Sequence, residues 1–215
     1  MGHQRGTWHG SGRPLNQPRQ RRPPTDADWL DRLFANGSGI WDLFVVVFYL
    51  PVIMGSLLWI HAVGGEWWLW DRLRGDRPVA DAAVGVVVGI GLVVASRLGE
   101  RSGPGRRAAR VLAHHMGKVS WPGLVLVGSS SAIGEELLFR GVLQPSMGLV
   151  VAAILFAVVH VPFREEMWPW TVQALLHGLL FGLAYELSEA LVLPIVAHTA
   201  FNTLQLVRWK RLSRA

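Results

Sequence analysis

Several ionisable side chains interrupt apolar stretches of this sequence, where a charge is costly. Glu135, Glu136 and Arg140 lie within one apolar run. A charged side chain at the centre of a membrane costs about 2.5–3.5 kcal/mol even on the milder insertion scale. We therefore expect other groups of the chain to pair with these residues or to use them in chemistry.

Helical spacing separates the two glutamates. Glu136 and Arg140 are four residues apart, so they share a helix face and can form an ion pair. Glu135 is turned by about 100° from Glu136, which leaves it free to face a polar cavity. In a second interpretation both carboxylates share Arg140 in a static network, and the spacing alone leaves the two interpretations open.

Two other apolar runs carry groups that could complete a hydrolytic site. His198 and Asn202 are four residues apart in the last run, and His160 follows Phe156 by one helical turn. Taken alone, His198 and Asn202 form an ordinary interhelical hydrogen-bonding pair, and His160 is a structural residue. Together with Glu135 they are sufficient for hydrolysis. A glutamate and a histidine can deprotonate water, and a second histidine and an asparagine can stabilise an oxyanion.

The same side chains permit a metal-dependent alternative. Glu135, His160 and His198 could hold zinc and leave an open position for water. The zinc-protease motif H-E-x-x-H is absent, as is the serine-hydrolase motif G-x-S-x-G. The chain has no cysteine, which excludes disulfides, thiolate metal sites and a cysteine nucleophile. The residues alone therefore leave both a site without a cofactor and a zinc site open.

Six apolar runs must position these residues. The 215 residues are 51% hydrophobic and 17% charged, with a mean hydropathy of +0.30, whereas an ordinary soluble domain is about 25% charged. Each run approaches the roughly 20 residues of a membrane helix, although the third contains charges and the fourth is short. We predict an all-α, polytopic membrane helix bundle of about six transmembrane helices, from runs at 40–63, 79–98, 119–143, 147–163, 168–187 and 190–207. Pro194 is expected to kink the last helix and open room beside His198.

The basic residues predict an orientation. Most of the 21 Lys and Arg residues lie at Arg164 and in segments 1–38, 97–118 and 208–214. If the chain crosses the membrane six times, all of these positions fall on the same side. Only Arg72, Arg74 and Arg77 fall on the other side. The positive-inside rule then places both termini in the cytoplasm of a multi-pass plasma-membrane protein. It also explains the pI near 10.9 without nucleic acid, so membrane lipids are the expected partners.

Four segments follow from this pattern. Residues 1–38 are predicted to be a disordered basic tail. Residues 39–118 hold two membrane spans and a basic cytoplasmic loop. The first span begins too late for a cleaved secretory signal and is interpreted as an anchor. Residues 119–207 form the catalytic membrane core, and residues 208–215 form a second basic tail.

Three motifs in this core resemble those of one protease family. Residues 135–140 match the E-E-x-x-x-R motif of the CPBP family, the CAAX-protease and bacteriocin-processing intramembrane proteases, also called Abi or Rce1-like. Residues 156–160 match its F-x-x-x-H motif, and residues 198–202 match its H-x-x-x-N motif. The motifs occur in the family's order, each in a separate predicted helix. The resemblance covers about 119–207.

The resemblance implies an intramembrane endopeptidase that acts on a prenylated or other membrane-associated peptide or protein substrate. For this family we favour a glutamate-type site without a cofactor and keep zinc as the alternative. By this resemblance Glu135 is the catalytic base, and His160 positions or polarises the water. His198 and Asn202 stabilise the oxyanion. Supporting structural roles fall to Glu136, Arg140 and Phe156. A non-catalytic membrane scaffold or bacteriocin-immunity protein is the alternative from another class. A proton-coupled transporter would show paired broken helices in two related halves, which the sequence lacks.

Overall fold

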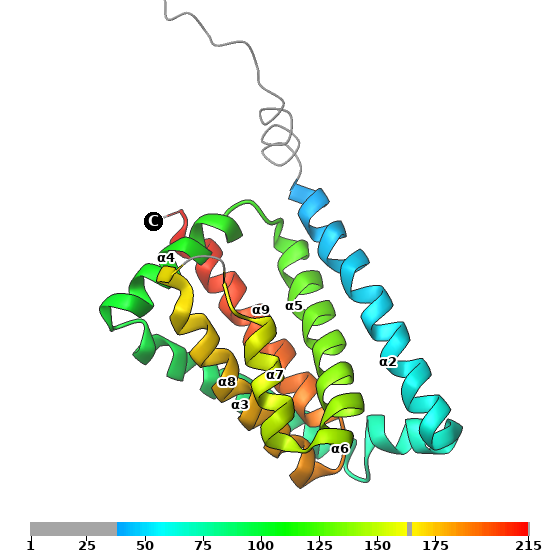
Figure 1. The fold of residues 1–215 in the computed structure, drawn as a ribbon. Coiled ribbons are helices and arrows are strands. Elements are labelled where there is room, and N and C mark those ends of the chain that lie inside the picture. The colour runs from blue at the N-terminus through cyan, green and yellow to red at the C-terminus, as the bar shows by residue number, and fades with distance from the viewer. Residues whose placement is uncertain (1–37, 163–164, 215) are drawn as a thin grey trace, which may run out of the picture.

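The structure is a computed structural model that describes residues 38–162 and 165–214. Throughout these two ranges the regular elements are helices, as predicted (Figure 1). In order they are α2 (Ser38–Arg74), α3 (Pro78–Gly99), α4 (Gly103–Met116), α5 (Trp121–Glu136), the π-helix η1 (Leu137–Leu143), α6 (Gln144–Met147), α7 (Leu149–Val159), the 3-10 helix η2 (Glu165–Met167), α8 (Trp168–Ser188) and α9 (Val192–Leu212). The predicted tail lies, apart from Ser38, outside the described residues, as does Arg164.

Two helices are long and apolar enough to cross a membrane. They are Leu43–Gly64, within α2, and Pro78–Gly99, which is α3, with mean hydropathies of 2.4 and 2.2. Only 11% and 22% of their most apolar windows are buried, whereas a core helix of a soluble protein would be mostly buried. The other four predicted runs are also helical. A count of six spans and the cytoplasmic placement of both termini stay predictions.

Helix α9 lies against four other helices, namely α3, α4, α5 and α8. Its contact with α3 is close because α3 presents glycines to it. A Cβ added at Gly85 would lie 2.8 Å from the carbonyl oxygen of Leu193, and one added at Gly89 would lie 2.6 Å from that of Ala197. Glycines four residues apart let two helix backbones approach closely, a common device in membrane bundles. Backbone contact thus fixes the helix that carries His198.

The predicted kink at Pro194 is wrong. Helix α9 begins at Val192, so Pro194 lies in its first turn. An N–H group in the first turn has no partner within the helix, so a proline there removes no hydrogen bond. The space beside His198 therefore comes from the way the helices pack.

The segment predicted to be a basic loop contains the helix α4. Its N-terminus is capped by Ser102, whose Oγ accepts a hydrogen bond from the backbone N–H of Gly105 at 3.1 Å. One face of α4 is buried and small, and it packs on α9. The buried side chains are Ala108, Ala109 and Ala113, and the exposed basic ones include Arg106, Arg107 and Arg110. The arginines occupy the solvent face of an amphipathic helix, which explains why a charge count suggested a loop.

Glu100 joins the end of α3 to α9. Arg208 pairs with both of its carboxylate oxygens, with Nη1 donating to Oε1 at 2.6 Å and Nη2 donating to Oε2. Gln205 also donates to Oε1 at 3.0 Å. Burial by itself would raise the pKa of Glu100, but the hydrogen bonds and positive charge of Arg208 outweigh it and hold that pKa below its ordinary value.

We expect Glu100→Gln to lower the melting temperature of the detergent-solubilised protein at pH 7. Because the pKa of Glu100 is lowered in the folded state, its stabilisation is fully present above the unfolded pKa, near 4.5, and is lost as pH falls through the folded pKa. Thermal unfolding of parent and variant across this range measures the effect. The difference between the two proteins should shrink in acid, and a constant difference would contradict the assignment.

Candidate active site

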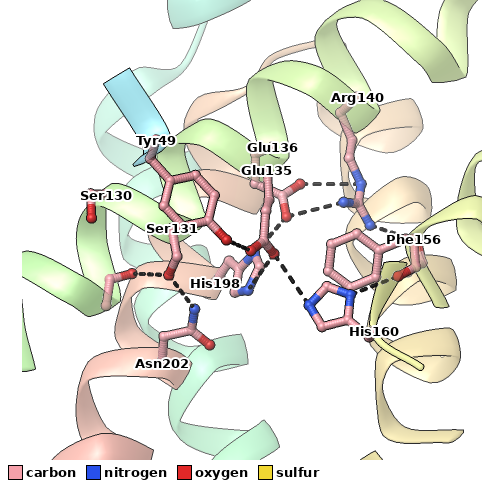
Figure 2. A network of polar contacts seen from close by, with 12 residues as sticks. Tyr49, Ser130, Ser131, Glu135, Glu136, Arg140, Phe156, His160, His198 and Asn202 are labelled. Atoms are coloured by element: carbon pink, nitrogen blue, oxygen red, sulfur yellow. Dashed lines mark hydrogen bonds and ion pairs between the residues drawn. The ribbon is translucent and has the colours of Figure 1, made fainter. Parts of the chain in front are cut away.

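The four residues predicted to be catalytic line one cavity. Glu135 lies in the last turn of α5, His160 directly follows α7, and His198 and Asn202 lie one turn apart on α9. Together with neighbouring side chains they surround a cavity of about 280 Å³. Figure 2 shows that Glu135, His160 and His198 point toward one another. Residues far apart in the sequence are thereby brought to a single site.

The two oxygens of Glu135 have different partners. Oε1 accepts a hydrogen bond from the hydroxyl of Tyr49 at 2.5 Å. Oε2 lies 3.8 Å from Nε2 of His160 and 3.8 Å from Nε2 of His198. The residue is 9% exposed. One oxygen is thus held by a helix of the N-terminal half, while the other faces two imidazoles.

Each histidine is anchored through its other ring nitrogen. Nδ1 of His160 donates to the backbone oxygen of Phe156 at 2.6 Å, and the two rings lie 4.5 Å apart between centroids. Nδ1 of His198 donates to Oε1 of Glu136 at 2.7 Å, and its ring stacks on Phe181 at 4.7 Å. Because both acceptors are oxygens without hydrogen, each Nδ1 carries the proton. In both rings Nε2 is the nitrogen directed at Glu135.

Glu136 forms the predicted ion pair with Arg140. Nε of Arg140 lies 3.1 Å from Oε2, and Nη1 donates to Oε1 at 3.2 Å. Both side chains are fully buried, with exposed fractions of 1% for Arg140 and 0% for Glu136. The contacts of Glu135 run instead to Tyr49 and the two histidines. The geometry therefore favours the first interpretation of the spacing, in which only Glu136 pairs with Arg140, and it adds His198 as a third member.

The helix widens into a π-helix directly after Glu136. Within and just beyond it, two side chains one turn apart reach α8: Arg140 donates to the carbonyl oxygen of Gly178 at 2.9 Å, and Gln144 donates to that of Gly182 at 3.0 Å. The guanidinium group also lies 4.9 Å from the ring centroid of Phe156, consistent with a supporting role for that residue. π-helical turns are rare and often occur at functional sites. Here the π-helix carries the cation that neutralises Glu136.

Asn202 faces the cavity one turn after His198. Its Nδ2 donates to Oγ of Ser131 on α5 at 3.1 Å, as Figure 2 shows. An amide nitrogen has two hydrogens, so this bond leaves one for another acceptor. Ser131 thus orients an amide that keeps a free donor at the site.

The sequence analysis did not single out every residue of the cavity. Tyr49 was missed, although it is one of only 2 tyrosines and a polar group inside the first apolar run, the same signal that identified the others. Ser131 lies in a run of three serines and carried no such signal. Gln173 and His177, two polar residues four positions apart in another apolar run, also line the cavity.

The described side chains include no group of three or more His, Cys, Asp or Glu arranged to hold a metal ion. In the alternative set, Oε1 of Glu135 is already engaged by the hydroxyl of Tyr49. We therefore derive no chemical step through a metal, and the preference for a metal-free site stays a prediction.

Comparison with known proteins identifies the segment that carries the site. Residues 117–204 match the family model described as "Type II CAAX prenyl endopeptidase Rce1-like". These residues, the Rce1-like segment, are therefore similar to that family. The Rce1-like segment includes all three motifs of the site, and its family is membrane-embedded. Tyr49 and Glu100 lie outside it.

One curated relative matches part of the chain. It is "Uncharacterized protein YpbD" of Bacillus subtilis (strain 168), 36% identical over 81 residues. The match covers 38% of this chain and 42% of the relative, so the chain spans less than half of that relative's length. No solved structure matches the chain.

Replacing Arg140 by Leu should destabilise the protein by about 3–5 kcal/mol, because it leaves Glu136 buried without its cation. Arg110→Leu, on the exposed face of α4, is the control and should cost less than about 0.5 kcal/mol. Unfolding in detergent by heat or denaturant measures both. The double variant Glu136→Gln/Arg140→Leu should lose less stability than the sum of the single variants, since it leaves no lone charge. Additive losses would contradict a coupled pair.

Proposed function

We propose that this protein is an intramembrane endopeptidase in which Glu135 activates the water that cleaves a peptide bond. The observation that carries the proposal is the meeting of one buried carboxylate oxygen with Nε2 atoms of two anchored histidines in a single cavity. These residues lie in the Rce1-like segment, whose family is described as an endopeptidase. Both lines of support lead to peptide-bond hydrolysis.

The water-activating half of the reaction uses Glu135 and His160. Oε2 of Glu135 accepts a proton from water as the water oxygen attacks the carbonyl carbon of the peptide bond. With its Nδ1 proton committed to Phe156, the neutral ring of His160 offers Nε2 as an acceptor for the other hydrogen of that water. Two acceptors thus orient one water, and the attack forms a tetrahedral intermediate with a negatively charged oxygen.

The other half of the site stabilises that oxygen. When both nitrogens of His198 are protonated, Nδ1 stays bonded to Glu136 and the Nε2 hydrogen points into the cavity. The free amide hydrogen of Asn202 supplies a second donor. Donors fixed in place before the reaction are the most effective stabilisers of an oxyanion. Glu135 then passes its proton to the amide nitrogen as the carbon–nitrogen bond breaks, which releases two peptides.

The surface of the bundle supports a site inside a membrane. Large apolar side chains are exposed along α2, α3, α7 and α8, and contiguous apolar patches of this kind are rare on soluble monomers. In a bilayer these side chains face lipid, and a membrane-associated or prenylated peptide reaches the cavity from within it. We place the protein in the plasma membrane with both termini in the cytoplasm, consistent with the distribution of basic residues.

Glu135→Gln should abolish cleavage while the protein stays folded, because an amide cannot accept the proton of the water. The measurement compares protein termini in host membranes that contain parent or variant at equal folded amounts. Termini that appear only with the parent establish proteolysis and name its substrates. New termini ending at a prenylated cysteine would place the substrate in the prenylated class.

The matched control for this experiment is Glu189→Gln, which makes the same change at an exposed glutamate between α8 and α9. Its profile of termini should equal that of the parent. If Glu135→Gln retains the parent's cleavage, the assigned mechanism is wrong. Identical profiles for parent and Glu135→Gln, together with an intact cellular function, would favour the membrane scaffold or immunity protein instead.

Cleavage should continue after metal removal. We expect purified protein treated with a zinc chelator, then dialysed, to keep the initial rate of the untreated protein, because the proposed reaction uses only side chains and water. The rate is measured on the substrate found by the comparison of termini. Loss of activity that returns on adding zinc would establish the metal-dependent alternative.

A further inference from the structure

Helix α2 contributes a side chain to the site from outside the Rce1-like segment. Tyr49 lies within the candidate membrane span Leu43–Gly64, far from the matched residues 117–204. Its hydroxyl donates to Oε1 of Glu135 at 2.5 Å, and its side chain lines the same cavity (Figure 2). Since Oε1 is engaged in this way, Oε2 is the oxygen left for the histidines.

The contact rests on a close fit between α2 and the helix that carries Glu135. A Cβ at Gly134 would lie 2.6 Å from Cδ1 of Tyr49, so only a glycine lets the ring lie against α5 at this height. Farther along the same interface, a Cβ at Gly141 would lie 2.6 Å from the side chain of Ile60, which is itself buried. Two glycine contacts therefore set the position of α2, and the hydroxyl reaches Glu135 as part of a packed interface.

We propose that Tyr49 is a positioning residue of the active site, which holds Oε1 of Glu135 so that Oε2 points at the water between the histidines. A hydrogen bond to a carboxylate is stronger than one between neutral groups, so a single donor is enough to hold the side chain. The catalytic consequence rests on the proposed function. The contact between Tyr49 and Glu135 does not.

The decisive variant is Tyr49→Phe, which keeps the ring against Gly134 and removes only the hydroxyl. If Tyr49 served packing alone, this variant would behave like the parent. As a positioning residue it should lower kcat by between about 10- and 100-fold and leave KM unchanged, because a misplaced catalytic group slows the reaction without weakening substrate binding. The rates are measured with the substrate identified from the protein termini.

The matched control is Tyr185→Phe, at the other tyrosine of the chain. Its hydroxyl accepts a hydrogen bond from Arg72 and does not line the cavity. Both kcat and KM of this variant should equal those of the parent. A second variant, Gly134→Ala, keeps the hydroxyl but pushes the ring of Tyr49 away, and it should reproduce the loss of kcat. It also keeps the proposal testable if Tyr49→Phe fails to fold.

A chemical measurement tests the contact without any substrate. Dicyclohexylcarbodiimide enters apolar regions and couples to carboxyl oxygens, and mass spectrometry of the purified protein reports how much reaches Glu135. Tyr49→Phe should raise labelling at Glu135 several-fold, because the hydroxyl no longer covers Oε1. Glu136, which is bound by Arg140 and His198, is the internal reference and should be labelled equally in both proteins.

The two measurements separate this proposal from the proposed function. If Glu135→Gln stops cleavage but Tyr49→Phe matches the parent in kcat and in labelling, the role of Tyr49 is refuted and the protease mechanism stands. If the parent cleaves nothing, the labelling still decides whether Tyr49 covers Glu135, and equal labelling of the two proteins refutes it. Raised labelling with a selective loss of kcat establishes the assignment.

Discussion

Burial of the Glu136 carboxylate is the constraint on which the rest of the structure depends. A lone carboxylate among apolar helices would be strongly destabilising, so the bundle must bring cations and donors to it. Arg140 supplies the charge from the next turn, and His198 supplies a ring N–H from α9. Satisfying Glu136 thus joins α5, η1 and α9 around one point. The hydrogen bond that His198 donates to Glu136 also sets the rotation of the His198 ring.

Adjacent glutamates with opposite surroundings are what give the site its chemistry. Glu136 is enclosed by a cation and a histidine, whereas Glu135, one residue earlier, borders a cavity. The helical rotation between neighbouring residues produces this difference without any change of element. Helix α9 then serves both carboxylates, since Nδ1 of His198 contacts one and Nε2 approaches the other. One imidazole therefore couples the stability of the bundle to the geometry of the candidate catalytic group.

Much of the site was accessible from the sequence because polar residues in apolar runs are conspicuous. The pair Glu136–Arg140 follows from four-residue spacing, and the helical fold class follows from composition. The first residue of α9 could not be predicted from the sequence, because capping and packing decide where a helix begins. Pro194 was therefore expected inside the helix, where it would cause a kink, whereas it lies in the first turn. The role of Tyr49 was hidden for a different reason. Its partner lies 86 positions away, and no local pattern encodes a contact between separate helices.

Close packing of α3 on α9 has a consequence for how such a site can diverge. At Gly85 and Gly89 nothing but hydrogen separates the two backbones, so the smallest enlargement there must shift α9 as a rigid rod. His198 directly follows Ala197, so it would move with the helix. A methyl group added to α3, a helix that does not line the candidate site, would therefore displace His198. Changes in the α3 sequence are restrained by steric exclusion on the face that contacts α9, and larger side chains fit on its exposed face.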